Sequence, residues 1–130
     1  MINNNLGWDA GARSVQTQSG DCVASFAPTP NSVGVIVGFN TINRDAGVAD
    51  IKYGIYFRKA AGVQLFSAIE AGAQVGASGT YTAADKFQIT RNTSVVQYWK
   101  NGVVFYTSAV LSTGIVFLDT SLYAAGDGVQ

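Results

Sequence analysis

The sequence predicts an all-β protein, an antiparallel sandwich or barrel, and three observations support this. Charged residues make up 12% of its 130 residues and hydrophobic ones 48%, with 15 glycines. Short runs rich in β-branched and aromatic residues recur, each bounded by Gly, Pro, Asn or Asp. No segment shows sustained helical periodicity. At this length we expect one domain over residues 1–130.

Four strands are predicted in the first 70 residues. The run "CVASFA" ends at Pro28 and Pro30, a strong break. "SVGVIVGFN" is apolar throughout, so we expect neither face of it to be fully exposed, whereas "TINRDAGVAD" is typical of an exposed loop. "IKYGIYFRK" alternates, with Tyr56 and Arg58 on the side opposite to its larger apolar residues. The predicted strands are 22–27, 32–40, 51–59 and 63–70, and the loop is 41–50.

The last third gives the clearest signals. Segment 71–85 is rich in Gly, Ala and Ser and resembles a linker, but its end predicts a corner that leads into strand 86–91. Asn101-Gly102 predicts a two-residue hairpin turn between 94–100 and 103–108, because both turn positions need positive φ. Asn92-Thr93 predicts a second turn, and 115–129 supplies one or two closing strands. The expected pairs are Lys100–Val103, Tyr98–Phe105, Val96–Thr107, Ile89–Val96 and Phe87–Tyr98.

This register divides the residues between two faces. The apolar face is expected in the core, together with Ile51, Tyr53, Ile55 and Phe57 from the 51–59 strand; it holds Phe87, Ile89, Val96, Tyr98 and Phe105. The other face mixes amides, hydroxyls and large rings: Gln88, Thr90, Gln97, Trp99, Val104 and Tyr106. Such a mixture suits a polar ligand with flat apolar faces, as sugars have.

We therefore predict a ligand-binding or interface site of Trp99, Tyr106 and Gln97, joined by Tyr56 and Arg58. One competing interpretation is structural: Trp99 and Tyr106 pack under a loop or against the edge of the second sheet, as aromatic residues in strands usually do. Another is a subunit interface, for which Trp and Tyr are favoured anchors.

An ordered set of motifs covers nearly the whole chain. They are "GWDAGA" (7–12), "SGDC" (19–22), "DIKYGIY" (50–56), "YTAADKFQI" (81–89), "VQYWKNGVVFYTS" (96–108) and "DTSLYAAG" (119–126). Together they resemble the concanavalin A-like (laminin G/SPRY-like) jelly-roll modules of bacterial surface proteins and of phage tail, fibre and capsid-decorating proteins. In this sequence Cys22 stands where the pattern usually has glycine. The pattern's first strand has no match before "NNNLGW", so we expect a piece of a longer chain or outer strands completed by a partner.

The resemblance implies a jelly-roll sandwich of two antiparallel sheets. As a family tendency, it implies binding of a cell-surface glycan or receptor at a virion or cell surface. The alternative is a structural module of a virion or surface assembly, a homo-oligomer such as a trimer, whose aromatic face makes subunit contacts.

Catalysis is not expected. The sequence has no histidine, which removes histidine-based triads and histidine-bound zinc. No two acids lie within three positions of each other, whereas glycosidases with this fold use a close pair, usually on one strand. A pair from two strands stays open. Cys22 has no base to activate it and is expected to be an inert thiol.

We expect no cofactor and no metal. Asp45 and Asp50, with Asn40 and Asn43, are the one calcium candidate, and a solvated loop is the preferred interpretation. Eight basic residues balance eight acidic ones, so no nucleic-acid partner is expected. No apolar run is long enough for membrane insertion, and no cleavable signal begins the sequence.

Overall fold

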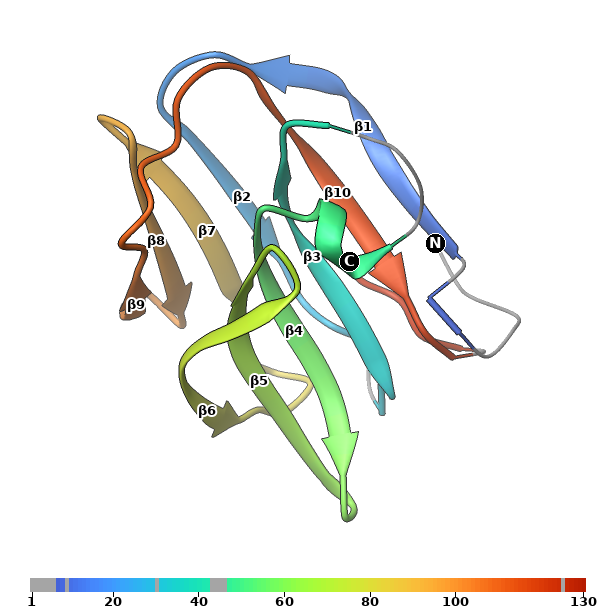
Figure 1. Cartoon of the computed structure of the whole chain (residues 1–130). Helices are drawn as coiled ribbons and strands as arrows, with labels where there is room; N and C mark the ends of the chain where they lie inside the picture. The colour runs from blue at the N-terminus through green and yellow to red at the C-terminus, as the bar shows by residue number, and fades with distance from the viewer. Residues whose placement is uncertain (1–6, 9, 30, 43–46, 125) are drawn as a thin grey trace.

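The computed structural model describes residues 7–8, 10–29, 31–42, 47–124 and 126–130, which form two antiparallel sheets packed as a sandwich (Figure 1). The two-sheet all-β prediction is confirmed. Helical structure among these residues is limited to the 3₁₀ turn η1 (Val48–Asp50), and no helix there is long and apolar enough to cross a membrane. The strands are β1 (Ala10–Gln18), β2 (Cys22–Phe26), β3 (Gly34–Asn40), β4 (Tyr53–Ala60), β5 (Val63–Glu70), β6 (Ala73–Thr80), β7 (Phe87–Asn92), β8 (Val95–Lys100), β9 (Val103–Thr107) and β10 (Val116–Leu122).

The larger sheet has the order β1-β10-β3-β4-β5-β6. Strand β3 lies at its centre and is buried over all seven residues, as its continuous apolar run predicts. The edge strands β1 and β6 were not predicted. Most of their residues are exposed, and many are small or polar, so neither shows hydrophobic alternation. The segment that resembles a linker therefore contains a strand.

The outer face of the larger sheet carries a small apolar cluster of its own. Ile36, Ile51 and Ile69 are buried there, and Trp8, Val48 and Tyr56 pack against them. Ile51 was predicted to be buried and is, but it belongs to this cluster and not to the core between the sheets.

The smaller sheet has the order β2-β7-β8-β9. Asn101-Gly102 forms the predicted two-residue turn between β8 and β9, with φ of 49° and 80° at the two residues. The pair Lys100–Val103 is confirmed, and Trp99 lies opposite Val104. Beyond that point the predicted pairing is wrong, since Gln97 and not Val96 lies opposite Thr107.

A β-bulge in β9 causes this difference. Tyr98 pairs with Tyr106 and Trp99 with Val104, which leaves Phe105 as an extra residue without a partner across the strand. The bulge interrupts the alternation of side chains, so the adjacent rings of Phe105 and Tyr106 both pack against the core between the sheets.

The turn before β8 is also displaced from its predicted place. Thr93 and Ser94 occupy it, with φ of 45° and 69°, in place of Asn92-Thr93. Asp21 Oδ1 accepts a hydrogen bond from the Thr93 backbone at 2.7 Å. Ile89 therefore pairs with Tyr98, and the predicted pairs Ile89–Val96 and Phe87–Tyr98 are wrong. The shift is two residues, so it leaves every β7 side chain on its predicted face.

The core between the sheets is built from edge-to-face aromatic contacts. Phe87 is fully buried, and its ring centroid lies 4.8 Å from that of Phe57 and 5.1 Å from that of Phe66. Phe105 closes the cluster 4.9 Å from Phe66, but it is half-buried where the sequence predicted mostly buried. The other predicted core residues between the sheets are buried as expected: Tyr53, Ile55, Phe57, Ile89, Val96 and Tyr98.

One end of the sandwich is fixed by the buried side chain of Arg91. Its guanidinium donates hydrogen bonds to the carbonyl oxygens of Gln18, Gly20 and Gly114 and to Ser112 Oγ, at 2.8–3.1 Å. It therefore ties the β1–β2 loop to the segment that crosses from β9 to β10. No carboxylate within the described residues forms an ion pair with Arg91, so backbone carbonyls carry this role.

Candidate functional site

The five predicted site residues lie in three places. Trp99 and Gln97 lie on the outer face of the four-stranded sheet, as the register predicts. Tyr56 and Arg58 lie on the outer face of the six-stranded sheet, on the opposite side of the sandwich. Tyr106 faces inward, with its ring centroid 5.8 Å from that of Tyr98. The structure therefore does not bring the five together.

The inward position of Tyr106 corrects its predicted face. A Cβ built on Gly76 of β6 would meet Tyr106 Cδ2 at 2.9 Å, so the ring packs against the backbone of the other sheet. Glycine at 76 is what leaves room for it. The structural interpretation of Tyr106, packing against the edge of the second sheet, agrees with this contact.

We name the outer face of the four-stranded sheet the Trp99 face; it is formed by Val23, Ser25, Gln88, Thr90, Gln97, Trp99, Val104 and Thr107. The indole of Trp99 is half-buried, and its Nε1 donates a hydrogen bond to Thr90 Oγ1 at 2.9 Å. Gln88 on the neighbouring strand β7 lies directly opposite Trp99. One aromatic ring is thus held in a fixed orientation among amide and hydroxyl groups.

Both glutamines of the Trp99 face are held by their amide nitrogens. Gln88 Nε2 donates to Ser25 Oγ at 3.0 Å, and Gln97 Nε2 donates to Thr107 Oγ1 at 3.2 Å. Neither side-chain carbonyl oxygen makes a hydrogen bond to the described residues. Each amide therefore presents an acceptor whose orientation is set by the sheet.

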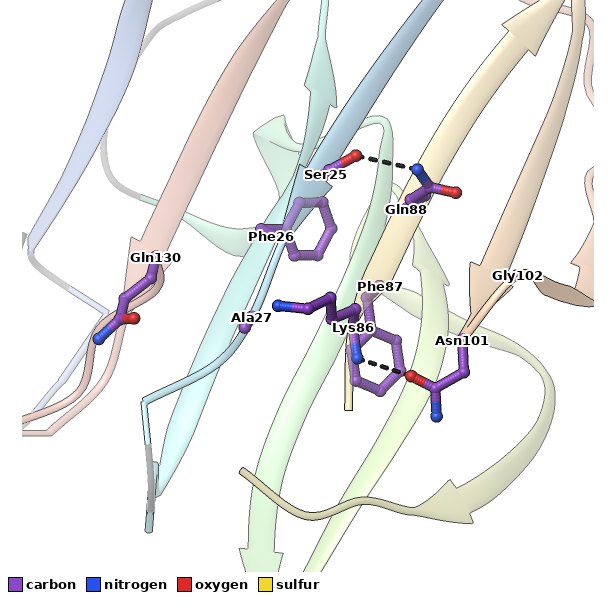
Figure 2. Close-up of a pocket in the computed structure, with 9 residues that line it drawn as sticks. All are labelled: Ser25, Phe26, Ala27, Lys86, Phe87, Gln88, Asn101, Gly102 and Gln130. Atoms are coloured by element: carbon purple, nitrogen blue, oxygen red, sulfur yellow. Dashed lines mark hydrogen bonds between the residues drawn. The ribbon is translucent and has the colours of Figure 1, made fainter. Parts of the chain in front are cut away.

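Two hollows flank this face. One, of about 350 Å³, is lined by Thr90, Gln97 and Trp99 together with Asp21, Cys22, Val23, Arg91 and Asn92. The other, of about 500 Å³, lies where β2 and β7 meet the β8–β9 turn, and Figure 2 shows its lining residues. Its walls are Ser25, Phe26, Ala27, Lys86, Phe87, Gln88, Asn101, Gly102 and Gln130. Trp99 does not line the larger hollow, but Gln88, its partner on the neighbouring strand β7, does, so the hollow lies one strand away from the indole.

On the opposite side, Tyr56 and Arg58 belong to a separate aromatic group. The Trp8 ring lies 5.8 Å from that of Tyr56 and 5.4 Å from that of Tyr123, and the Arg58 guanidinium lies 6.0 Å from the Tyr56 ring. Burial raises the pKa of Tyr56. The sequence analysis did not predict that Trp8 and Tyr123 lie beside Tyr56, because the three residues are far apart in the sequence and only the tertiary structure brings them into contact.

The described acids are engaged in structural contacts and do not line a common cleft. Asp85 forms an ion pair with Lys100, and the hydrogen bond from Asn101 holds the pKa of its carboxyl below the ordinary value. Asp127 accepts from the backbone of Val33, Gly34 and Ala124. Glu70 accepts from the hydroxyl of Tyr98 at 2.9 Å. Of the residues that line the two hollows, Asp21 alone is a carboxylate.

No group of three or more His, Cys, Asp or Glu side chains that could hold a metal occurs in the described residues. Asn43 and Asp45 of the calcium candidate lie outside them. Asn40 Nδ2 donates to Asp119 Oδ2 at 3.0 Å, and burial raises the pKa of Asp119. Burial likewise raises the pKa of the half-buried Cys22 thiol, a shift that disfavours the reactive thiolate.

No family model matches the sequence, and no curated protein matches it. Solved structures do. The PSpry domain of TRIM65 has a TM-score of 0.62 at 11% identity over 96% of this chain and 70% of that one. A toad ovary galectin in complex with thio-digalactose has a TM-score of 0.48 at 14% identity, over 93% of this chain and 97% of that one. Bacillus licheniformis β-glucanase has a TM-score of 0.45 at 18% identity, over 88% of this chain and 58% of the glucanase.

At these identities the likeness shows the fold alone. The six- and four-stranded antiparallel sheets form a concanavalin A-like jelly-roll sandwich, the fold implied by the sequence motifs.

Proposed function

We propose that the protein is a non-catalytic glycan-binding module and that its ligand lies across the Trp99 face. One observation carries the proposal: a half-buried indole, fixed by its hydrogen bond to Thr90, lies on an outer sheet face otherwise lined by amides, hydroxyls and small apolar groups. The apolar face of a sugar ring stacks on an indole, while its hydroxyls need directed acceptors and donors. The carbonyl oxygens of Gln88 and Gln97 supply such acceptors.

The absence of catalysis in this proposal rests on the acids. A glycosidase needs two carboxyl groups about 5–10 Å apart across the scissile bond. The two hollows beside the Trp99 face offer Asp21 alone among their lining residues, and its Oδ1 already accepts from the Thr93 backbone. We therefore assign binding and release of the glycan to this face, without bond cleavage.

We further propose that the module works in a phage or bacterial surface assembly and binds a cell-surface glycan there. The support is the ordered set of motifs from "GWDAGA" to "DTSLYAAG", which resembles modules of that kind. In the competing proposal, the Trp99 face contacts a second copy of the chain. The molecular mass in solution separates the two, because subunit contacts through Trp99 predict that Trp99→Ala lowers the mass.

A glycan array is the direct test. Wild-type protein is expected to bind a defined set of glycans, and Trp99→Ala is expected to abolish that binding. Tyr56→Ala is the matched control, because it removes a half-buried aromatic ring from the opposite face. Loss of binding in Tyr56→Ala with retention in Trp99→Ala would move the site to the other face. Absence of glycan binding by the wild type would refute the proposal.

A further inference from the structure

The larger hollow near Trp99 contains a cationic side chain, Lys86, that stacking of a sugar on the indole does not use. Its base is apolar, because the buried rings of Phe26 and Phe87 contribute to its lining. Its other walls are polar, from Ser25, Gln88 and Asn101. Lys86 is the one cationic side chain among the lining residues, and in Figure 2 it extends across the hollow in the direction of Ala27.

The charge of Lys86 is not neutralised within the described residues. The neighbouring carboxylate, Asp85, is engaged elsewhere: it lies 3.3 Å from Lys100 Nζ and accepts from Asn101 Nδ2 at 2.7 Å and the Thr82 backbone at 2.8 Å. No ion pair of Lys86 is formed with the described residues. Lys86 is an exposed residue, so its ammonium is free to meet an anion that enters the hollow.

We infer that this hollow receives the acidic group of an anionic glycan, a carboxylate or a sulfate, and that Lys86 pairs with it. The inference rests on the proposed function and names its ligand class. Gln88 connects the Trp99 face with the hollow, because it lies opposite Trp99 on the neighbouring strand and also lines the hollow. Paired strands lie about 5 Å apart, so a sugar ring stacked on Trp99 has its neighbouring substituent over the hollow.

Lys86 is the group that recognises the acidic substituent. Lys86 Nζ donates a charge-assisted hydrogen bond to one oxygen, which is stronger than a bond between neutral partners. Asn101 Nδ2 already donates to Asp85, and Gln88 Nε2 already donates to Ser25, so neither competes with Lys86 for the anion. Phe26 and Phe87 border the hollow from below, but their rings are buried in the core and offer a sugar little surface of their own. A neutral glycan makes the Trp99 contact and leaves the ammonium unpaired.

The test is an array of matched pairs, each an acidic glycan beside the same glycan without its acidic group: sialylated and desialylated, sulfated and unsulfated, uronate and carboxyl-reduced. Wild-type protein is expected to bind the acidic member of a pair about tenfold more tightly. Lys86→Gln is expected to remove that preference while leaving the affinity for the neutral member unchanged. Lys59→Gln, an exposed lysine on β4 of the other sheet, is the matched control and is expected to keep the preference.

The outcomes separate this inference from the proposed function. If neutral and acidic members bind equally and Trp99→Ala abolishes both, the function stands and the acidic class is wrong. If the preference for acidic glycans survives in Lys86→Gln, another cation provides it and the assignment of Lys86 is wrong. If no glycan binds, the proposed function fails and this inference fails with it. Weaker binding of the acidic member at raised salt supports the inference, because an ion pair is screened.

Discussion

Two pairs of aromatic residues are consecutive in the sequence: Tyr98 and Trp99 on β8, and Phe105 and Tyr106 on β9. The Asn101-Gly102 turn joins the two strands. In β8 the backbone alternates regularly, so Tyr98 is fully buried and Trp99 lies on the outer face. In β9 the bulge at Phe105 turns both rings inward.

The difference shows how one inserted residue changes the use of a ring. Without the bulge, Tyr106 would lie beside Gln97 on the Trp99 face and complete a two-ring platform. With it, Tyr106 fills the space above Gly76, and the Trp99 face has a single large ring bordered by two hollows. Under the proposed function, a single indole bordered by two hollows suits one stacked sugar with substituents on either side.

The largest expected effect is that of removing the buried member of the first pair. Tyr98→Ala should destabilise the fold by about 3–5 kcal/mol, because the ring is fully buried and its loss leaves a cavity. Tyr98→Phe keeps the ring and loses only the hydrogen bond to Glu70, so it should cost about 1 kcal/mol. Chemical denaturation measures both. A small effect of Tyr98→Ala would contradict the assignment of faces in β8.

The second prediction tests the inward position of Tyr106. Gly76→Ala should cost about 2–3 kcal/mol, since φ is +70° and the new Cβ meets the Tyr106 ring. Gly62→Ala is the control: its φ is +78° but nothing lies within 4 Å, so it should cost only the backbone strain of about 1–2 kcal/mol. In a Tyr106→Ala background the two costs should become equal. If Gly76→Ala keeps its full excess there, Tyr106 does not face β6.

The third prediction concerns the turn on which both pairs depend. Gly102 has a φ of +80°, which a β-branched residue resists, so Gly102→Val should cost about 1–2 kcal/mol by thermal or chemical unfolding. No atom lies within 4 Å of its Cβ position, so packing adds nothing. Stability equal to the wild type would mean that the turn does not set the register that separates Tyr98 from Trp99.

The parts of the fold that could be predicted have a local signal. Alternation identified β4, β7 and β8, and Asn-Gly identified the turn before β9. The edge strand β6 has no such signal, because its sequence of Ala, Gly and Ser does not show which residues are inside. The Thr93-Ser94 turn departs from local preference, since Asn92 is the better residue for positive φ.

The candidate site could be predicted only in part, for the same reason. Trp99 and Gln97 follow from alternation alone. The bulge at Phe105 has no glycine to indicate it, so alternation alone places Tyr106 on the wrong face. Tyr56 and Arg58 were grouped with Trp99 because both sets face away from the core, and strand order alone shows that these are two different outer faces.

The smallest expected effect on stability is that of Trp99→Ala, and it is the most informative. The change removes a half-buried ring and the 2.9 Å hydrogen bond to Thr90, both on a face that water reaches, so it should cost about 1 kcal/mol. Binding should respond far more, because a stacking ring is a dominant contact of a small polar ligand. The measurement is paired: thermal unfolding and glycan affinity on the same preparation. A loss of more than about 3 kcal/mol would make Trp99 a structural residue like Tyr98. Unchanged affinity for a glycan that the wild type binds would place the ligand elsewhere, and the distinction between the two members of the first pair would then concern packing alone.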